Sequence, residues 1–288
     1  MTDIPSIQWF PGHMTKTKRM IKANLPLVDA VVEIVDARVP ESSRNPDLQS
    51  LIEKKPRIVI LNKCDAADEE ATQKWLSWYA KQGVTAVAAD CRSGKGLNKF
   101  VPAVKTVLSD LLEKYESKGM KGRAVHLMVV GIPNVGKSSF INRLAKQKKA
   151  KVEDRPGVTR DKQWIRMSED IELLDMPGVL WPKFEDMSVG EKLAFTGAVK
   201  DDVVDTEALA SRLLYVLNGL YGSRISERYK IETSENEDGY ELLLKVGKAR
   251  GMLISGGEIN TERAAAVVLD EYRSGKLGRI TLELPPKE

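Results

Sequence analysis

The chain has 288 residues, of which 42% are hydrophobic and 6% aromatic, enough for one large or two smaller globular domains. Its formal net charge is +4 and its pI is near 8.8, a balance that permits a nucleic-acid partner without requiring one. No apolar run reaches the length of a membrane span, and the first residues lack the core of a secretory signal. Two cysteines, Cys64 and Cys91, are too few for a disulfide framework, so we expect a cytoplasmic protein.

The first two-thirds of the chain alternates short β-branched runs with helical stretches, which is the pattern of a parallel α/β sheet. Strands are expected at 31–35, 57–61, 85–88 and 124–130, followed by a hairpin of 164–167 and 171–174. Helices are expected at about 47–54, 69–82, 97–117 and 137–146, and a charged linker at 116–122.

After Trp181-Pro182 the pattern changes to apolar residues at helical spacing, such as Leu209, Leu213 and Leu217. Asn260 is placed to cap a later helix. We therefore predict two domains, one over residues 1–185 and a smaller, mostly α-helical one over residues 186–288.

A phosphate-binding loop is indicated by Gly131-Ile132-Pro133-Asn134-Val135-Gly136-Lys137-Ser138, directly after the strand ending at Val130. Glycines let backbone N–H groups close around phosphate oxygens, and the following helix N-terminus adds a positive field. Lys137 would reach the β- and γ-phosphates, and the Ser138 hydroxyl would bind Mg²⁺. The predicted phosphate ligands are Asn134, Val135, Gly136, Lys137, Ser138 and Ser139.

The base is indicated by Asn62-Lys63-Cys64-Asp65, which follows the strand ending at Leu61 and matches the N-K-x-D pattern. The Asp65 carboxylate would accept hydrogen bonds from N1 and N2 of guanine, and adenine has no such pair of donors. Leaving those acceptors unpaired in a closed pocket costs a few kcal/mol, which favours guanine. We therefore predict that the chain binds GTP and GDP and hydrolyses GTP.

A nucleotide-sensing switch is indicated by Asp175-Met176-Pro177-Gly178, at the end of the strand 171–174. Asp175 would hold the Mg²⁺ shell, and the Gly178 amide would sense the γ-phosphate. Thr159, in the polar loop between the phosphate loop and this motif, is the candidate switch threonine that completes the Mg²⁺ shell.

The motifs run in an unusual order, because the guanine motif precedes the phosphate loop. A sheet with this order closes if the linker near 118–123 joins what are the two ends of an ordinary GTPase domain. The predicted fold is therefore α/β: a circularly permuted P-loop GTPase domain followed by the helical domain. The new ends fall after the Asp175 switch, so the γ-phosphate would set the orientation of residues 186–288.

The chain resembles the ribosome biogenesis GTPase A family over nearly its whole length. The segments that carry the resemblance are Gln8–Met14, Val35–Pro40, Arg155–Thr159, Leu180–Phe184 and Ser255–Gly257, together with the permuted order. The resemblance implies a bacterial factor that binds the immature large ribosomal subunit late in assembly. It also implies a helical C-terminal domain that grips ribosomal RNA.

The resemblance further implies residues that the motifs alone do not assign. It places a purine-supporting loop at Asp90-Cys91-Arg92, which makes Asp90 and Cys91 candidate ligands. Ras-like proteins carry a water-orienting glutamine after the switch, but here Val179 and Leu180 follow it. The resemblance places the loop of Pro11–Met14 near the γ-phosphate, which makes His13 the catalytic candidate beside Lys137. His13 as an RNA-binding terminal residue is an equal alternative.

Asn134 supplies a further hypothesis, that it helps to bind a K⁺ ion which acts like an arginine finger. Basic residues cluster at 146–151 and again at Lys245, Lys248, Arg250, Lys276 and Arg279. They would meet RNA phosphates, or they would simply form a solvated face.

Three functional readings stay open. The first is a GTPase stimulated by the assembling large subunit, with hydrolysis favouring release. The second is a switch with a non-ribosomal protein partner, and the third is an RNA-binding scaffold with a structural nucleotide. We expect a monomer with no membrane and no DNA partner. The guanine motif argues against an ATP-dependent kinase.

Overall fold

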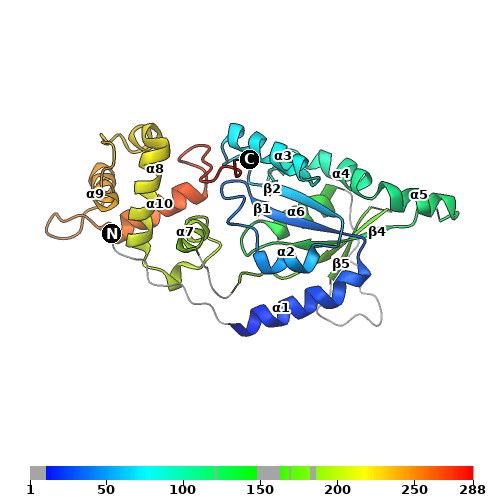
Figure 1. The fold of residues 1–288 in the computed structure, drawn as a ribbon. Coiled ribbons are helices and arrows are strands. Elements are labelled where there is room, and N and C mark those ends of the chain that lie inside the picture. The colour runs from blue at the N-terminus through cyan, green and yellow to red at the C-terminus, as the bar shows by residue number, and fades with distance from the viewer. Residues whose placement is uncertain (1–10, 121, 148–162, 169, 182–185, 288) are drawn as a thin grey trace. The chain divides into compact units, whose positions relative to one another are not determined.

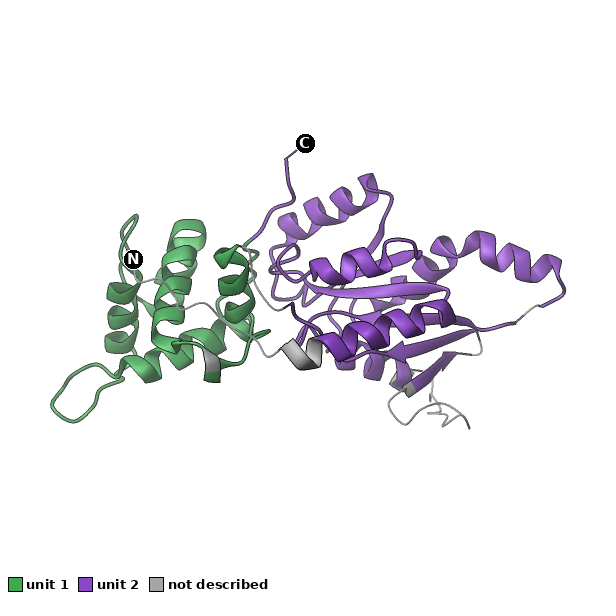
Figure 2. Ribbon diagram, turned by 60° about the horizontal axis from the view of Figure 1, so that its bottom comes forward, with its two compact units in different colours: residues 1–8, 183–282 green, residues 9–182, 283–288 purple. Residues whose placement is uncertain are grey.

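The computed structural model describes residues 11–120, 122–147, 163–168, 170–181 and 186–287. The chain divides into two compact units, one of residues 9–182 with 283–288 and one of residues 1–8 with 183–282 (Figure 2). We call them the sheet unit and the helical unit. No helix in these ranges combines the length and the apolarity needed to cross a bilayer.

The sheet unit is built on one six-stranded sheet in the order β3-β2-β1-β4-β6-β5 (Figure 1). The strands are β1 (Ala30–Asp36), β2 (Arg57–Asn62), β3 (Thr85–Ala89), β4 (Val125–Val130), β5 (Gln163–Ser168) and β6 (Ile171–Asp175). All neighbouring strands are parallel except the β5–β6 hairpin, which is antiparallel. The predicted strands and hairpin are confirmed.

One long connection lets the permuted chain form a continuous sheet. The chain passes from the edge strand β3 through α4 (Phe100–Val107) and α5 (Ser109–Ser117) to the central strand β4. This connection was expected to hold one helix over 97–117. The structure breaks it at Leu108, where the backbone leaves helical geometry with φ −109° and ψ 20°.

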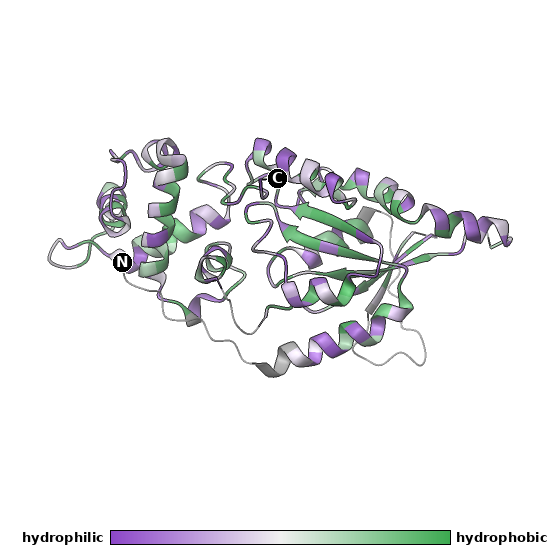
Figure 3. Cartoon of the chain, viewed as in Figure 1, coloured by the Kyte–Doolittle hydropathy of each residue, from purple (hydrophilic) through white to green (hydrophobic). Residues whose placement is uncertain are grey.

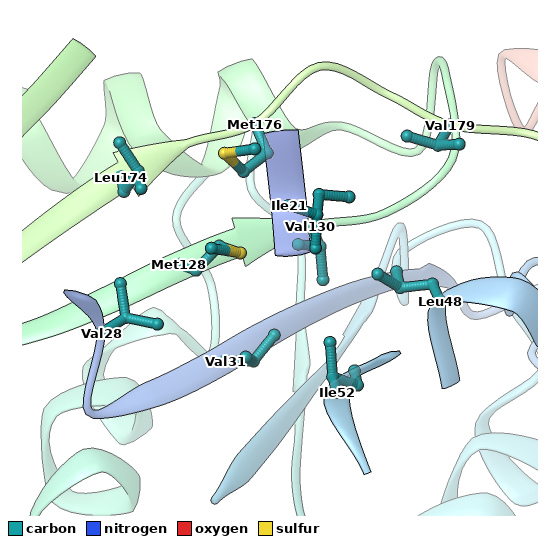
Figure 4. Packing of buried hydrophobic residues seen from close by; sticks show 10 residues of the cluster. All are labelled: Ile21, Val28, Val31, Leu48, Ile52, Met128, Val130, Leu174, Met176 and Val179. Carbon is teal, nitrogen blue, oxygen red and sulfur yellow. The ribbon is translucent and has the colours of Figure 1, made fainter. Parts of the chain in front are cut away.

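Three helices cover one face of the sheet. They are α1 (Pro11–Asn24), α2 (Pro46–Ile52) and α3 (Glu69–Lys81). Figure 4 shows Ile21 of α1 and Ile52 of α2 beside Val31 and Met128 of the strands. Trp75 and Tyr79 of α3 pack on the same face, around Val35 and Leu61. The α1 helix is a feature that the sequence pattern did not predict.

Side chains alternate along a strand, so the residues between these point to the other face. Every residue of β1 is buried, and the hydrophobic strands lie between helices of mixed polarity (Figure 3). The helices α4 and α6 (Lys137–Gln147) both contact the sheet. They meet through Phe100 and Phe140, whose rings lie edge to face at 5.1 Å.

The end of the chain returns to the sheet unit. The buried Glu283 carboxylate accepts hydrogen bonds from the backbone N–H groups of Glu41 at 2.8 Å and Ser42 at 3.0 Å. The indole N–H of Trp75 donates to the Glu283 carbonyl at 2.9 Å. Charge-assisted bonds of this kind are stronger than neutral ones, so they fix the loop that follows β1.

The helical unit contains α7 (Met187–Phe195), α8 (Thr206–Tyr229), α9 (Gly239–Ala249) and α10 (Thr261–Arg273). Side-chain caps start each helix: Asp186, Asp205, Asp238 and Asn260 accept bonds from backbone N–H groups of the first turn. The predicted Asn260 cap and the stripe of Leu209, Leu213 and Leu217 are confirmed, because all three leucines are fully buried.

Candidate nucleotide-binding site

The sequence-predicted motifs meet at one edge of the sheet. The strands β1, β2, β4 and β6 run parallel, so their carboxyl ends lie at the same edge. Asp36, the guanine motif, the phosphate loop and Asp175 come at or directly after these ends. Ligands of open α/β sheets bind in the crevice outside this edge.

The phosphate loop, residues 131–138, depends on two glycines. Gly131 has φ 153° and Gly136 has φ 102°, a region in which side chains are strained. A Cβ added to Gly136 would lie 2.2 Å from the Asn62 side-chain nitrogen, and one at Gly131 would lie 2.5 Å from the Ile34 carbonyl. The loop therefore packs against β1 and the guanine motif at distances that only glycine allows.

Lys137 starts α6 and its side chain is buried. Its ammonium group donates to the loop carbonyls of Gly131 at 3.2 Å and Ile132 at 3.0 Å. Burial lowers the pKa of Lys137 to about 8, against the opposing effect of the Asp175 carboxylate. An anion bound in the loop would therefore stabilise the charged form of Lys137.

The guanine motif is joined to the phosphate loop by two side chains. The Asn62 amide donates to the Val135 carbonyl at 2.7 Å and accepts from the Cys91 N–H at 3.0 Å. The Lys63 ammonium donates to the Asn134 carbonyl at 2.9 Å. The two sites for base and phosphates are thus fixed relative to each other by bonds between sequence-distant motifs.

Sequence reasoning missed Asp36 as part of the site. Its buried carboxylate accepts from Nε and Nη2 of Arg38, at 2.9 and 2.7 Å, and lies 3.0 Å from the Lys63 ammonium. Burial alone would raise the pKa of Asp36, but Arg38 and Lys63 hold it well below its usual range. An aspartate at the last position of a buried strand, with an arginine two residues later, is the signal that marks it.

The other residues predicted to bind the base lie in the loops after β2 and β3. Asp65 forms an exposed ion pair with Arg92 at 3.0 Å. Asp90 accepts bonds from the N–H groups of Arg92 and Ser93, which keep its pKa low although burial raises it. Burial raises the pKa of the Cys91 thiol to about 12. The backbone N–H of Cys91 donates to the Asn62 side chain, so Cys91 helps to hold the guanine motif in position.

The switch segment lies against the phosphate loop. A Cβ added to Gly178 would lie 2.9 Å from both the Lys137 ammonium and the Pro133 nitrogen. The Val179 N–H donates to the Gly131 carbonyl at 3.3 Å, and the Val179 carbonyl accepts from Asn45 at 3.0 Å. The side chains of Val179 and Leu180 are buried and apolar, so neither can orient a water molecule.

Some of the remaining predicted residues are described by the structure, and others are not. Asn134, Ser138 and Ser139 are exposed at the loop, so their polar groups are accessible to a ligand. Thr159 lies outside the described residues, and of His13 only the backbone is described. Residues 11–14 form the first turn of α1, where a loop was expected.

A Mg²⁺ ion fits the donor set at the loop only together with a nucleotide. No group of three or more His, Cys, Asp or Glu side chains that could hold a metal occurs in the part of the chain that the structure describes. The oxygen donors are the exposed Ser138 hydroxyl and Asp175, whose pKa burial raises against the lowering effect of Lys137. Hard oxygen donors in small number are what Mg²⁺ uses when phosphates complete its shell.

Comparison with known proteins decides the family. Ribosome biogenesis GTPase A of Priestia megaterium is 47% identical over 281 residues, which cover 97% of each chain. The chain belongs to the ribosome biogenesis GTPase A family. A family member from Bacillus cereus is 45% identical over 97% of this chain and 94% of its own. Membership of this family identifies the chain as a GTP-hydrolysing enzyme.

Further comparisons reach beyond bacteria and to solved structures. Mouse mitochondrial ribosome-associated GTPase 1 is 36% identical over 96% of this chain and 90% of its own. YlqF from T. maritima, solved with bound GNP, superposes with a TM-score of 0.63 at 27% identity, covering 93% of this chain and 98% of that one. A GDP-bound YlqF structure has a TM-score of 0.64.

A family model described as "50S ribosome-binding GTPase" matches residues 126–245 of this GTPase A family member. The match begins within β4, just before the phosphate loop, and does not reach the guanine motif at Asn62–Asp65. This is what the permuted order produces, because the guanine motif stands upstream of the phosphate loop in the chain.

Proposed function

We propose that this GTPase is a late assembly factor of the large ribosomal subunit, with GTP favouring the bound state and hydrolysis favouring release. The observation that carries the nucleotide-dependent part of the proposal is that the guanine motif is hydrogen-bonded to the phosphate loop, by Asn62 to Val135 and by Lys63 to Asn134. The names of the bacterial relatives and the description of the family model support the ribosomal part.

The contacts support the following ligand roles. Asp65 would bind N1 and N2 of guanine, while Asn62 and Lys63 hold its position. Asp90, Cys64 and Cys91 support the base pocket. The amides of residues 134–139 would bind the phosphates, and Lys137 would exchange its two carbonyl partners for phosphate oxygens. Gly178, already against the phosphate loop, would sense the γ-phosphate.

A bound Mg²⁺ would be held by Ser138, Asp175 and Thr159, and it would neutralise charge on the phosphates. K⁺ near Asn134 is a further proposed cofactor. The prediction is that turnover is faster in K⁺ than in Na⁺ buffer. Equal rates would remove K⁺ from the site.

The catalytic group is proposed to be His13, because the buried Val179 and Leu180 leave the usual position without a polar side chain. His13 belongs to α1, whose Ile21 packs in the core beneath the sheet. An imidazole titrates near neutral pH and can orient or deprotonate a water molecule.

The helical unit is proposed to follow the nucleotide state and to contribute to ribosomal RNA binding. In the chain it follows the switch at Gly178, and it is followed directly by Glu283, which belongs to the sheet unit and bonds the loop after β1. Solution scattering with GDP and with a non-hydrolysable GTP analogue tests this coupling. Identical curves would contradict it. We further propose that the protein acts as a cytoplasmic monomer without membrane or DNA partners.

The central experiment is GTP turnover with and without purified large ribosomal subunits, in K⁺ buffer. His13→Ala is compared with His126→Gln, which changes the chain's other histidine, a half-buried residue 3.2 Å from Glu172. Stimulation that His13→Ala alone abolishes supports both parts of the proposal. Stimulation that survives in His13→Ala keeps the ribosome and removes His13, and no stimulation of the wild type removes the ribosome.

A further inference from the structure

The solvent face of α1 is a row of cations without acids. Lys16, Arg19 and Lys22 are exposed and follow one another at three-residue spacing, so they lie along one side of the helix. The segment Pro11–Asn24 contains no acidic residue. Among the described residues, no carboxylate forms an ion pair with any of these three side chains.

The row continues into a hollow shared with α2. Lys18, Arg19 and Lys22 line one wall, and Asp47, Ser50 and Leu51 of α2 line the other. Lys18 forms an ion pair with Asp47, which fixes the two helices side by side. Ile21 on the inner side of α1 packs with Leu48 in the core, so the cations stand on a rigid support.

A second hollow, of about 610 Å³, lies on the far side of α2 and shares Ser50 with the first. Arg44, Lys55 and Arg57 line it, and each is only partly exposed. Lys55 donates to the Val28 carbonyl at 2.6 Å, and Arg57 lies 3.5 Å from the buried Glu33. These contacts hold the cations in place at the edge of the hollow.

The charge balance of the two hollows is positive. Their lining residues include six cations, Lys18, Arg19, Lys22, Arg44, Lys55 and Arg57, against two carboxylates, Asp47 and Glu53. Glu41 and Glu33 compensate part of the charge of Arg44 and Arg57. The uncompensated charge is therefore concentrated on α1.

We infer that this α1–α2 basic surface binds the sugar–phosphate backbone of RNA. A row of exposed cations at regular helical spacing matches a string of phosphates. A membrane would need an apolar face on α1, but Ile21 is buried in the core. An acidic protein would need large apolar anchors among the cations, and from Thr15 to Asn24 the exposed residues other than the cations are Thr15 and Ala23.

The inference rests on the proposed ribosomal role only for the source of the RNA. It differs from the proposed role of the helical unit, because the surface belongs to the sheet unit alone. In the helical unit, Lys245 and Arg250 form ion pairs with Glu237 and Glu271. On α1, Lys18 is paired with Asp47, but Lys16, Arg19 and Lys22 form no ion pair with a carboxylate among the described residues.

The test is fluorescence anisotropy of a labelled RNA stem-loop, titrated with the GDP-bound protein over a range of salt concentrations. The variant is Arg19→Gln/Lys22→Gln, and the matched control is Lys99→Gln/Lys105→Gln, two exposed lysines of the same unit with the same change in net charge. Loss of two phosphate contacts should weaken binding about tenfold or more near 0.1 M salt and reduce the slope of log K against log salt by about two. The control should stay near wild type.

Equal losses in both variants would overturn the inference, since only net charge would then matter. So would a variant with normal RNA affinity and impaired binding to large subunits, which would indicate an acidic protein partner. Melting curves check that the variant is folded. If large subunits do not stimulate turnover while the RNA difference remains, the proposed ribosomal role fails and the inference stands.

Discussion

The nucleotide edge and the α1–α2 basic surface both gather cations, but they hold them in opposite ways. At the edge, Arg38 and Lys63 share the buried carboxylate of Asp36, and Lys137 is enclosed by carbonyls. On the surface, Lys16, Arg19 and Lys22 stand in solvent. A buried charge is stable only beside a fixed partner, and a site built from fixed partners can bind one ligand in one position. Exposed charges keep their hydration, so they have little desolvation cost, and their side chains can adjust to a polyanion of variable shape.

Removing the carboxylate that organises the edge should have the largest effect. Asp36→Asn removes the carboxylate that pairs with the buried Arg38, so the free energy of unfolding should fall by about 3–5 kcal/mol at pH 7. Chemical denaturation measures this value. The double variant Asp36→Asn/Arg38→Met should recover part of the loss, and an unchanged stability in the single variant would contradict the view that the edge depends on paired buried charges.

The same variant gives a pH signature. The pKa of Asp36 is depressed in the folded state, so its contribution is fully present above the unfolded value near 4 and is lost as pH falls toward the folded value. The stability difference between wild type and Asp36→Asn should therefore be constant from pH 7 to about pH 5. It should shrink below about pH 4.

Changing the predicted guanine ligand Asp65 should affect nucleotide binding but not RNA binding. Asp65→Asn removes the acceptor for two guanine donors, and charge-assisted bonds contribute about 1.5–3 kcal/mol each. GTP and GDP affinity should fall roughly 100-fold or more, measured with a fluorescent nucleotide, while RNA affinity of the basic surface should not change. Lys99→Gln serves as the exposed control. A loss of less than tenfold would show that Asp65, paired with Arg92 at 3.0 Å, does not bind the base.

Lys137 should make nucleotide binding depend on pH. Its pKa is about 8 without a ligand, and phosphates should raise it, so binding takes up a proton near and above pH 8. Affinity for GDP should fall up to tenfold per pH unit above that value, since the ammonium form must be restored. Calorimetry in buffers of different ionisation enthalpy counts the proton. No proton uptake at pH 8.5 would mean that Lys137 stays charged in the free protein.

The smallest effect is expected on the other side of the comparison. Arg19→Gln/Lys22→Gln changes exposed side chains that are tied to no carboxylate among the described residues, so stability should change by less than about 0.5 kcal/mol. The same denaturation experiment checks it against Asp36→Asn. A loss of several kcal/mol would mean that these cations serve the fold of α1, and the comparison between the two regions would fail.

Local patterns in the sequence were enough to predict the strands, the hairpin, the helical unit and the motifs that meet at one edge of the sheet. Short apolar runs indicate the strands. Gly131, Gly136 and Lys137 indicate a phosphate loop, because few other residues fit its backbone and chemistry. The break at Leu108 and the α1 helix escaped prediction. Tertiary contacts decided both, since Ile21 is part of a core that only the folded sheet creates.

The sequence by itself determined which motifs the protein has and in what permuted order they occur. The tertiary structure alone decided which side chains connect them: Asp36 with Lys63, Asn62 with Val135, and Glu283 with the loop after β1. These partners are up to 242 positions apart, so no local pattern encodes their contact. They meet because parallel strands bring their carboxyl ends to one edge, where buried charges must find a counter-charge.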